Sequence, residues 1–214
     1  SLTRDDLVVL AVPVRSIVRY LSRLPRDPLI MDVGSTNVEI VRIPRRRGLR
    51  FIGCHPIAGT EKSGPEAADP RIFQGRICLI TAGRGVEKKD RDKIVRLWRG
   101  LGSTVLPIGA KDHDRILAAV SHLPHAAAYA LVGAIARLAG PSCERRFALA
   151  GLKDTTRIAA SPPEMWTDIF LTNRREILKC LSVLQKELSG LTTLIRKKKE
   201  HRLRRWLQRG QKIR

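Results

Sequence analysis

Three short segments that follow strand-like apolar runs carry the residues best placed to line a binding site. The segments are Val12, Pro13 and Val14, then Gly34, Ser35 and Thr36, and finally His55 and Pro56. In an open α/β sheet, a ligand binds outside the carboxyl ends of the parallel strands. We therefore expect all three segments to meet at one edge of a sheet, with a cleft against the second half of the chain as the site.

Two histidines in the second half could reach that cleft. His122 and His125 are three residues apart, so they would share one face of a helix. Pro124 lies between them and predicts a kink or a restart of the helix at this point. The alternative interpretation is that each histidine caps or packs a helix.

The elements that must position these residues follow from the hydrophobic pattern. In the first half, apolar runs alternate with helical patterns, which predicts an α/β sheet with right-handed crossovers. Run 7–13 has no polar alternation and is typical of a strand covered on both faces. The predicted strands are 7–13, 29–35, 51–56, 77–81 and 103–108, and the predicted helices are 16–24 and 88–101.

After about residue 110 the pattern becomes purely helical. The predicted helices are 112–138, 163–170, 172–188 and 191–208. The expected domains are an α/β domain over 1–109, a helical domain over 110–190 and a basic tail over 191–214. Four large side chains are expected in the core: Trp98, Met165, Trp166 and Phe170.

The chain has 214 residues and a net charge of +21, and much of the excess lies at its end. Residues 191–214 hold ten Lys or Arg and one acid, a net charge of +9. We interpret this segment as a solvated final helix, with binding to nucleic acid or an anionic surface as the alternative. No RNA-binding aromatic motif or helix-turn-helix signature accompanies the charge, so we do not expect a nucleic-acid partner.

Other classes of protein are excluded by simple patterns. The apolar stretches are too short or too interrupted for a membrane span, and no secretion signal is visible at the start. The four cysteines are far apart and lack a C-x-x-C pair, so neither a metal site nor a disulfide framework is expected. We therefore expect a reducing, cytoplasmic setting.

Several longer motifs resemble the prephenate/arogenate dehydrogenase family of tyrosine biosynthesis. The matching segments are 6–14, 32–35, 53–64, 121–125, 153–159 and 163–170. The block His-Pro-Ile-Ala-Gly-Thr-Glu-Lys-Ser-Gly after Cys54 and the block Ser-His-Leu-Pro-His at 121–125 are the most specific of these. The resemblance implies a Rossmann-like nicotinamide-binding domain followed by a helical dimerisation domain.

The resemblance also implies a reaction. The family oxidises a cyclohexadienol with NAD(P)+ and releases its ring carboxylate as CO2, so prephenate or arogenate is the expected small-molecule substrate. His55 resembles the histidine that accepts a hydrogen bond from the substrate hydroxyl, and Arg157 the arginine that anchors a substrate carboxylate.

Further roles carry over by position. Ser35 resembles a residue near nicotinamide and substrate, with the polar end of a strand as the alternative. Thr60, Glu61 and Ser63 would bind substrate or orient His55, unless they only form turn hydrogen bonds within their loop. His122 and His125 would join the substrate side, and Val12, Pro13 and Val14 the cofactor side.

The chain also departs from the family pattern. It lacks the G-x-G-x-x-G turn that cradles a dinucleotide pyrophosphate, so we expect the first βαβ unit to be missing and NAD or NADP to bind weakly or not at all. Asn37 stands where the family usually has a lysine. The alternatives to an active enzyme are a truncated, inactive remnant that keeps the fold and dimer surface, or a basic nucleic-acid-binding protein.

Two of the predicted helices are apolar around most of their circumference. The residues concerned are Ile116, Leu117, Val120, Leu131, Val132, Ile135 and Leu138 in one helix, and Ile177, Leu178, Leu181, Val183, Leu184 and Leu188 in the other. Such helices must be covered on all sides. We therefore expect a two-fold homodimer, unless the α/β half covers the surplus.

Overall fold

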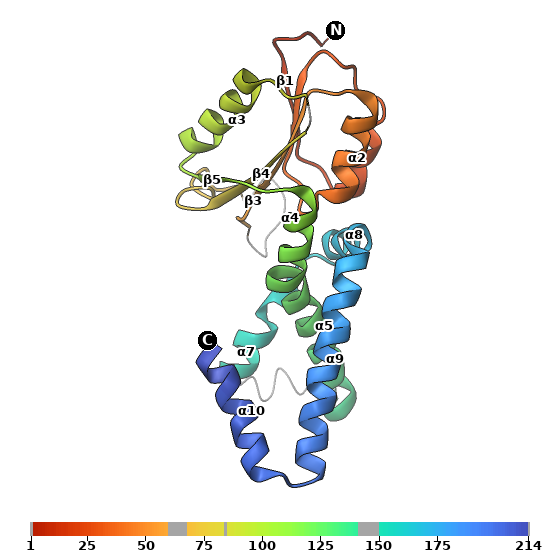
Figure 1. The fold of residues 1–214 in the computed structure, drawn as a ribbon, viewed down its shortest axis with the longest axis vertical. Helices are drawn as coiled ribbons and strands as arrows, with labels where there is room; N and C mark the ends of the chain where they lie inside the picture. The colour runs from red at the N-terminus through yellow and green to blue at the C-terminus, as the bar shows by residue number, and fades with distance from the viewer. Residues whose placement is uncertain (1, 60–67, 84, 141–149, 214) are drawn as a thin grey trace.

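The chain forms a sheet domain followed by a helical domain, as the computed structural model shows for residues 2–59, 68–83, 85–140 and 150–213 (Figure 1). The sheet has five strands in the order β1-β2-β3-β4-β5. All neighbouring pairs are parallel except β3 and β4. The strands are β1 (Leu7–Leu10), β2 (Leu29–Asp32), β3 (Phe51–Pro56), β4 (Ile77–Ala82) and β5 (Thr104–Pro107).

Helices cover both faces of the sheet. The three helices are α1 (Val14–Leu21), α2 (Val38–Arg47) and α3 (Lys88–Gly100). Successive residues of a strand point to opposite faces, so Ile30 of β2 packs with α1 and α2, whereas Leu29 and Met31 pack toward α3 and its Trp98. This gives a three-layer α/β domain.

Two expectations about the sheet are wrong. The sheet is mixed, because β4 runs antiparallel to β3. The described parts of the connection between them, 57–59 and 68–76, contain no helix that would make a parallel crossover. The first strand is also covered only in part on its second face: Leu7 packs against the core there, but Val9 is 45% exposed.

The helical domain is built around one long helical stretch. Its helices are α4 (Ala110–Leu117), a π-helical turn (Ala118–His122), α5 (Leu123–Ala139), α7 (Ala150–Thr156), a 3-10 turn (Arg157–Ala160), α8 (Pro163–Thr172), α9 (Arg174–Arg196) and α10 (Glu200–Ile213). The stretch 110–139 is continuous. Pro124 cannot donate a helical hydrogen bond, and the wider π turn directly before it marks the predicted restart at Leu123.

Other boundaries also differ from expectation. Helix α2 contains Pro44 and three consecutive arginines, and no helix was predicted there. Helix α9 continues through Gly190, whereas two separate helices were expected on either side of it. Met165, expected in the core, is 43% exposed.

The stretch 110–139 is also long and apolar enough to cross a membrane by length and composition alone, contrary to expectation. We interpret it as a core helix, because buried polar residues interrupt its apolar surface. His113, Asp114 and His122 are all buried and bonded to neighbouring elements.

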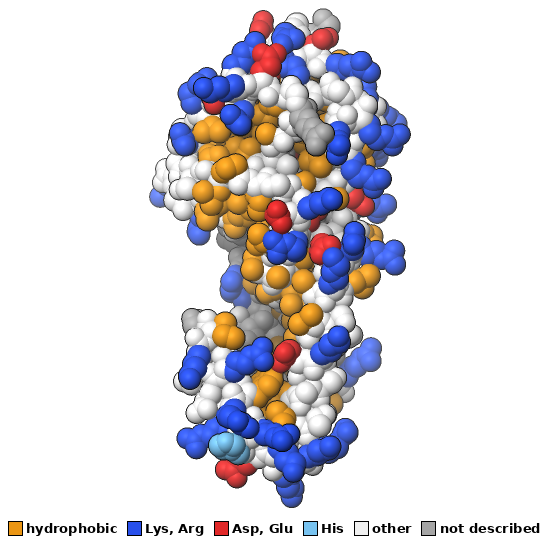
Figure 2. Space-filling model, in the orientation of Figure 1, with side chains coloured by type: hydrophobic (Ala, Val, Ile, Leu, Met, Phe, Trp, Pro, Cys, Tyr) orange, Lys and Arg blue, Asp and Glu red, His pale blue; other side chains and the backbone are white. Residues whose placement is uncertain are grey.

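Apolar side chains remain exposed on the helical domain. Val120 is 68% exposed and Leu138 is 87% exposed. The space-filling view shows hydrophobic side chains at the waist between the domains, and Lys and Arg side chains gathered at the end where α9 turns into α10 (Figure 2).

Candidate functional site

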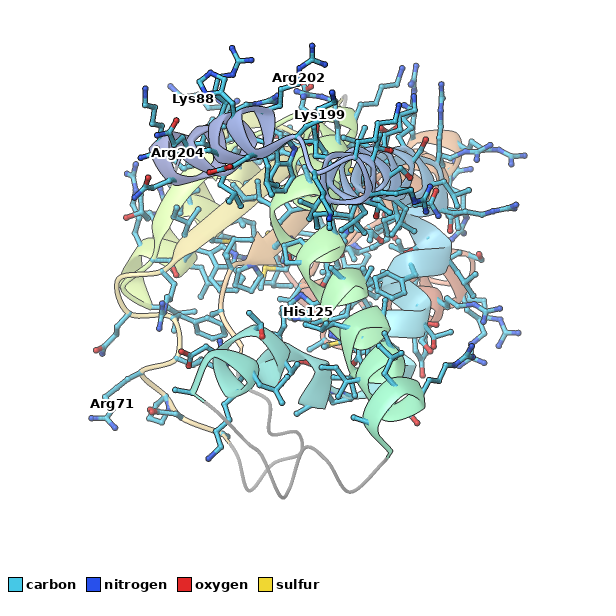
Figure 3. The ribbon with its side chains drawn as sticks, turned by 90° about the horizontal axis from the view of Figure 1, so that it is seen from below. Arg71, Lys88, His125, Lys199, Arg202 and Arg204 are labelled. Atoms are coloured by element: carbon cyan, nitrogen blue, oxygen red, sulfur yellow. The ribbon has the colours of Figure 1, made fainter. Side chains whose placement is uncertain are left out.

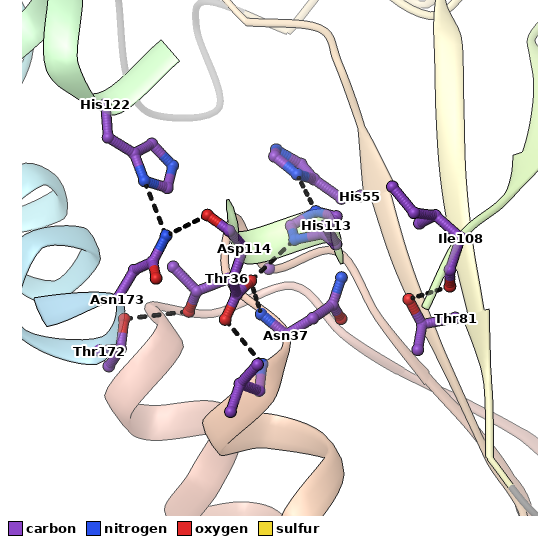
Figure 4. Close-up of polar contacts among 12 residues, drawn as sticks. Thr36, Asn37, His55, Thr81, Ile108, His113, Asp114, His122, Thr172 and Asn173 are labelled. Atoms are coloured by element: carbon purple, nitrogen blue, oxygen red, sulfur yellow. Dashed lines mark hydrogen bonds and ion pairs between the residues drawn. The ribbon is translucent and has the colours of Figure 1, made fainter. Parts of the chain in front are cut away.

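A chain of hydrogen bonds at the domain boundary links two histidines and an aspartate (Figure 4). Nδ1 of His55, on β3, lies 2.8 Å from Nε2 of His113 on α4. Nδ1 of His113 lies 2.8 Å from Oδ1 of Asp114. His113 and Asp114 are buried, whereas His55 keeps part of its surface accessible.

Asp114 joins the two domains. The backbone N–H of Asn37 donates to its Oδ1 over 2.8 Å, and the N–H of Val38 donates to its Oδ2 over 2.9 Å. These groups lie at the start of α2, where backbone N–H groups have no partner within the helix. An aspartate of the helical domain therefore caps a helix of the sheet domain.

His122 is held by α9. The side-chain amide nitrogen of Asn173 donates to the backbone oxygen of Asp114 over 2.8 Å and to Nδ1 of His122 over 3.2 Å. Since Nδ1 of His122 accepts this hydrogen bond, the proton of the neutral ring is on Nε2. His122 therefore presents a donor, from the end of the π-helical turn.

His125 lies one turn further along, on α5 (Figure 3). Its ring stacks on Trp166 of α8, with centroids 3.6 Å apart and planes inclined by 22°. Its Nδ1 donates to the backbone oxygen of Ser121 over 2.9 Å. Burial lowers the pKa of His125, and the charge of Arg157 lowers it further, so these two predicted site residues lie close enough to interact electrostatically.

Arg157 also lines an open cavity of about 540 Å³. The cavity lies between α5, α7 and the 3-10 turn that Arg157 begins, and Val132, Lys153 and Thr156 line it as well. Two cationic side chains, Lys153 and Arg157, and one acidic side chain, Asp154, line this cavity, and the cationic excess suits an anionic ligand.

Burial favours the neutral form of His55 and of His122. It lowers the pKa of His55 to about 3, helped by the charges of His113 and His122. Burial also lowers the pKa of His122 to about 4, against the opposing charge of Asp114. A histidine that resists protonation in the free protein is available as a hydrogen-bond acceptor near neutral pH.

A buried carboxyl group lies beneath the site at the end of β2. Burial raises the pKa of Asp32 to about 7, although its oxygens accept the backbone N–H groups of Cys54 and Gly34 over 3.0 and 3.1 Å. The side chain of Asn37 is fully buried close by, and neither of its amide atoms has a partner among the described residues. Asn37, at the position where the family usually has a lysine, is therefore an interior residue of the domain.

Of the predicted site residues at the strand ends, some are accessible at the edge of the sheet and one is not. Val12 and Pro13 are exposed there and Ser35 is half-buried, so these three remain accessible. The side chain of Val14 is instead buried in the core with Ile17. Thr60, Glu61 and Ser63 lie outside the described residues.

Three site residues were missed from the sequence: His113, Asp114 and Asn173. His113 lies 58 positions from its partner His55, and Asp114 lies 77 positions from its partner Asn37. Asn173 lies 51 positions from its partner His122. No spacing rule reaches that far. A polar Asp-His-Asp run at 112–114, inside an otherwise apolar helical pattern, was the only signal.

Carboxylates of the helical domain already accept N–H groups at both helix N-termini of this edge. At α2, Asn37 and Val38 donate to Asp114, and at α1 the N–H of Arg15 donates to Asp168 over 3.3 Å. A pyrophosphate subsite normally uses such unpaired N–H groups. Among the described residues, the edge therefore fits the nicotinamide end of a cofactor better than its phosphates. The described residues also include no cluster of three or more His, Cys, Asp or Glu side chains that could hold a metal ion.

Comparisons with known proteins match both halves of the chain. Residues 1–106 match the prephenate dehydrogenase nucleotide-binding domain, and residues 109–209 match the prephenate dehydrogenase dimerization domain. The chain is 32% identical over 201 residues to a cyclohexadienyl dehydrogenase of Zymomonas mobilis, which covers 89% of this chain and 68% of that protein. It is 31% identical over 212 residues to the prephenate dehydrogenase of Bacillus subtilis, covering 94% of this chain but 57% of that relative.

A solved structure agrees with these sequence matches. The crystal structure of prephenate dehydrogenase from A. aeolicus, in complex with hydroxyphenyl propionate and NAD+, superposes with a TM-score of 0.87 at 35% identity. The match covers 96% of this chain and 74% of that chain. The chain therefore belongs to the prephenate dehydrogenase family and carries both its nucleotide-binding and its dimerisation domain.

Proposed function

We propose that this chain is the part of a prephenate dehydrogenase that binds and activates the substrate, for oxidative decarboxylation of prephenate or arogenate with NAD(P)+ in tyrosine biosynthesis. The observation that carries the proposal is His55, a neutral imidazole at the end of β3 whose Nδ1 is bonded to His113. In such a reaction the substrate hydroxyl must lose its proton as hydride leaves the same carbon. A positioned imidazole contributes to this step as a hydrogen-bond acceptor and base.

In the proposed site, Nε2 of His55 accepts the hydrogen bond from the substrate hydroxyl. His122 offers an N–H donor nearby, because its Nδ1 is already bonded to Asn173. Arg157 anchors a substrate carboxylate, since its planar guanidinium can hold both oxygens at once. His125, stacked on Trp166, interacts electrostatically with both Arg157 and His122, which supports its place in the same region.

The cofactor supplies the acceptor for the hydride when it is bound. Ser35, with Val12 and Pro13, is the candidate surface for its nicotinamide end, since these residues are accessible at the carboxyl edge of the parallel strands. The pyrophosphate would need N–H groups other than those of α1 and α2, which already donate to Asp168 and Asp114.

We further propose a homodimer in the cytoplasm. Exposed apolar side chains on the faces of α9 and of the π-helical turn support a second copy as the partner: Val183 is 61% exposed and Val120 is 68% exposed. Both line one apolar cleft with Ile116. A second copy that covers this face would shield all three from water.

The test is turnover of prephenate and of arogenate by the intact protein from its source, followed as NADH or NADPH absorbance. Reduction of the cofactor with either substrate supports the proposal, and the four combinations assign substrate and cofactor. A substrate-induced rise in melting temperature without turnover would identify an inactive remnant. Neither turnover nor a thermal shift would contradict the proposed function.

A further inference from the structure

We infer that His113 and Asp114 are positioning residues that set the tautomer of His55, so that its Nε2 is the atom that accepts the substrate proton. This inference rests on the proposed function for the identity of the substrate. The inferred proton positions on the histidine rings are those of the protein without substrate, so they can be tested in the protein alone.

The proton positions follow from what each atom can donate. Asp114 already accepts two backbone N–H groups, and an ionised carboxylate is an acceptor only. Nδ1 of His113 must therefore donate to Oδ1 of Asp114, over 2.8 Å. In a neutral His113 the other nitrogen, Nε2, is then an acceptor.

The same reasoning passes to the next ring. Nε2 of His113 accepts, so Nδ1 of His55 must be the donor across the 2.8 Å contact between them. A neutral His55 with its proton on Nδ1 has a lone pair on Nε2. Nε2 makes no hydrogen bond within the described part of the chain, so it is available to the substrate.

The chain of bonds also holds the ring of His55 in place while the proton is transferred. When the O–H bond of the substrate breaks, its proton moves to Nε2 and the ring of His55 becomes positive. Nδ1–H of that ring still donates to His113, and the negative charge of Asp114 lies on the far side of His113. An aspartate that orients a histidine and fixes its tautomer is a known device of catalytic triads.

Asp114 also favours the opposite tautomer of His122, in which Nε2 carries the proton. Its backbone oxygen accepts from the amide of Asn173, and this orients the amide nitrogen so that it also donates to Nδ1 of His122. The two histidines therefore differ in function: His55 presents an acceptor and His122 presents a donor. His122 acts electrostatically on His55, so the two rings lie in one region, and a hydroxyl group is donor and acceptor at once.

Nitrogen-15 NMR of histidine rings in the purified chain tests the inference without substrate or cofactor. We expect His55 to carry its proton on Nδ1 and His122 on Nε2, with signals assigned by His→Gln variants. In His113→Leu, His55 should lose its Nδ1-protonated form. In His113→Gln, whose side-chain oxygen can still accept, His55 should keep most of it.

The matched control is His201→Gln. His201 is exposed on α10, far along the chain from the site, and its removal should leave the other rings unchanged. A wild-type His55 protonated on Nε2 would overturn the inference, and this result needs no variant to fold. An unchanged tautomer in a folded His113→Leu would overturn it as well.

Kinetics of the intact enzyme separate this inference from the proposed function. We expect His113→Leu to lower kcat by roughly ten- to a hundredfold, within the range that general-base catalysis contributes, with little change in KM. His113→Gln should restore most of the loss. Asp114→Asn should also lower kcat, whereas Asp112→Asn, two positions earlier on an exposed side chain, should not.

An inactive wild-type enzyme would contradict the proposed function and leave the NMR result standing. An active enzyme in which His113→Leu keeps its normal kcat would contradict the inference alone.

Discussion

The carboxylate of Asp114, in the helical domain, lies 2.8 Å from the backbone nitrogen of Asn37, in the sheet domain. A second contact of the same type joins Asp168 of α8 to the N–H of Arg15 in α1, over 3.3 Å. Carboxylates from the helical domain thus occupy the positive ends of two helices that lead from the sheet. These contacts join the sheet domain to the helical domain, and the first of them also orients the histidines.

The first prediction concerns the base. In the intact enzyme, His55→Asn should lower kcat by roughly 10²- to 10⁴-fold and raise KM far less, because the proton is transferred mainly in the transition state. Steady-state kinetics measure both. His201→Asn, on the exposed surface of α10, is the control and should leave kcat and KM unchanged. A near-normal kcat for His55→Asn would show that this residue is not the base.

The second prediction concerns the anchor. Arg157→Ala should raise KM roughly ten- to a hundredfold with little change in kcat, because a charged hydrogen bond worth about 1.5 to 3 kcal/mol is lost in both ground and transition states. Arg137→Ala removes an exposed arginine at the end of α5 and serves as the control. A loss confined to kcat would contradict the anchoring role.

The third prediction concerns the cofactor. The chain of 214 residues should bind NAD+ more weakly than micromolar, because the N-termini of α1 and α2 already donate to Asp168 and Asp114. Isothermal titration calorimetry measures this directly. The A. aeolicus enzyme, whose crystal structure contains NAD+, is the positive control. Micromolar binding by this chain would refute the prediction.

The fourth prediction is that folding stability decreases as the pH falls from about 6.5 toward 4. The folded pKa values of His55 and His122 are about 3 and about 4, below the unfolded value of about 6.5, so unfolding takes up a proton at each ring. Asp32 opposes them: its folded pKa of about 7 means that unfolding releases a proton there. Unfolding therefore takes up about one proton in total, so the free energy of unfolding should change by about 1.4 kcal/mol per pH unit.

Denaturant unfolding at several pH values tests this. His122→Gln should remove about one proton from the uptake and flatten the slope, because the unfolded chain then has one histidine fewer to protonate. His201→Gln, on the exposed surface of α10, is the matched control variant. Stability that rises as the pH falls through this range would be opposite in sign to the prediction.

The fifth prediction concerns assembly. Light scattering at tens of micromolar should give a mass near twice the 24.0 kDa of one chain. Val183→Glu should shift the protein toward the single-chain mass, because it places a charge in the apolar cleft beside Val120. Leu101→Glu, 38% exposed at the end of α3, is the control. A wild-type mass of one chain at all concentrations would exclude the dimer.

Much of the fold was predictable because it depends on local patterns. The apolar run at 29–35 predicted a strand, which the structure has at 29–32, and the pattern at 88–101 predicted a helix, which the structure has at 88–100. Pro124 predicted the restart of the long helix for a similarly local reason. The expectation that a first βαβ unit is missing stays a prediction, as do the domain boundaries.

The direction of β4 and the composition of the site depended on tertiary structure. An apolar run such as 77–82 fits a parallel or an antiparallel neighbour equally well, so its sequence does not decide which forms. His113 and Asp114 are adjacent on one helix, and only the packing of α4 against α2 and β3 brings His55 and Asn37 to them. The sequence by itself determined that His55 stands at the end of a strand and that Arg157 follows the long helix. Tertiary structure decided which nitrogen of His55 is free, because that depends on hydrogen-bond partners far away in the chain.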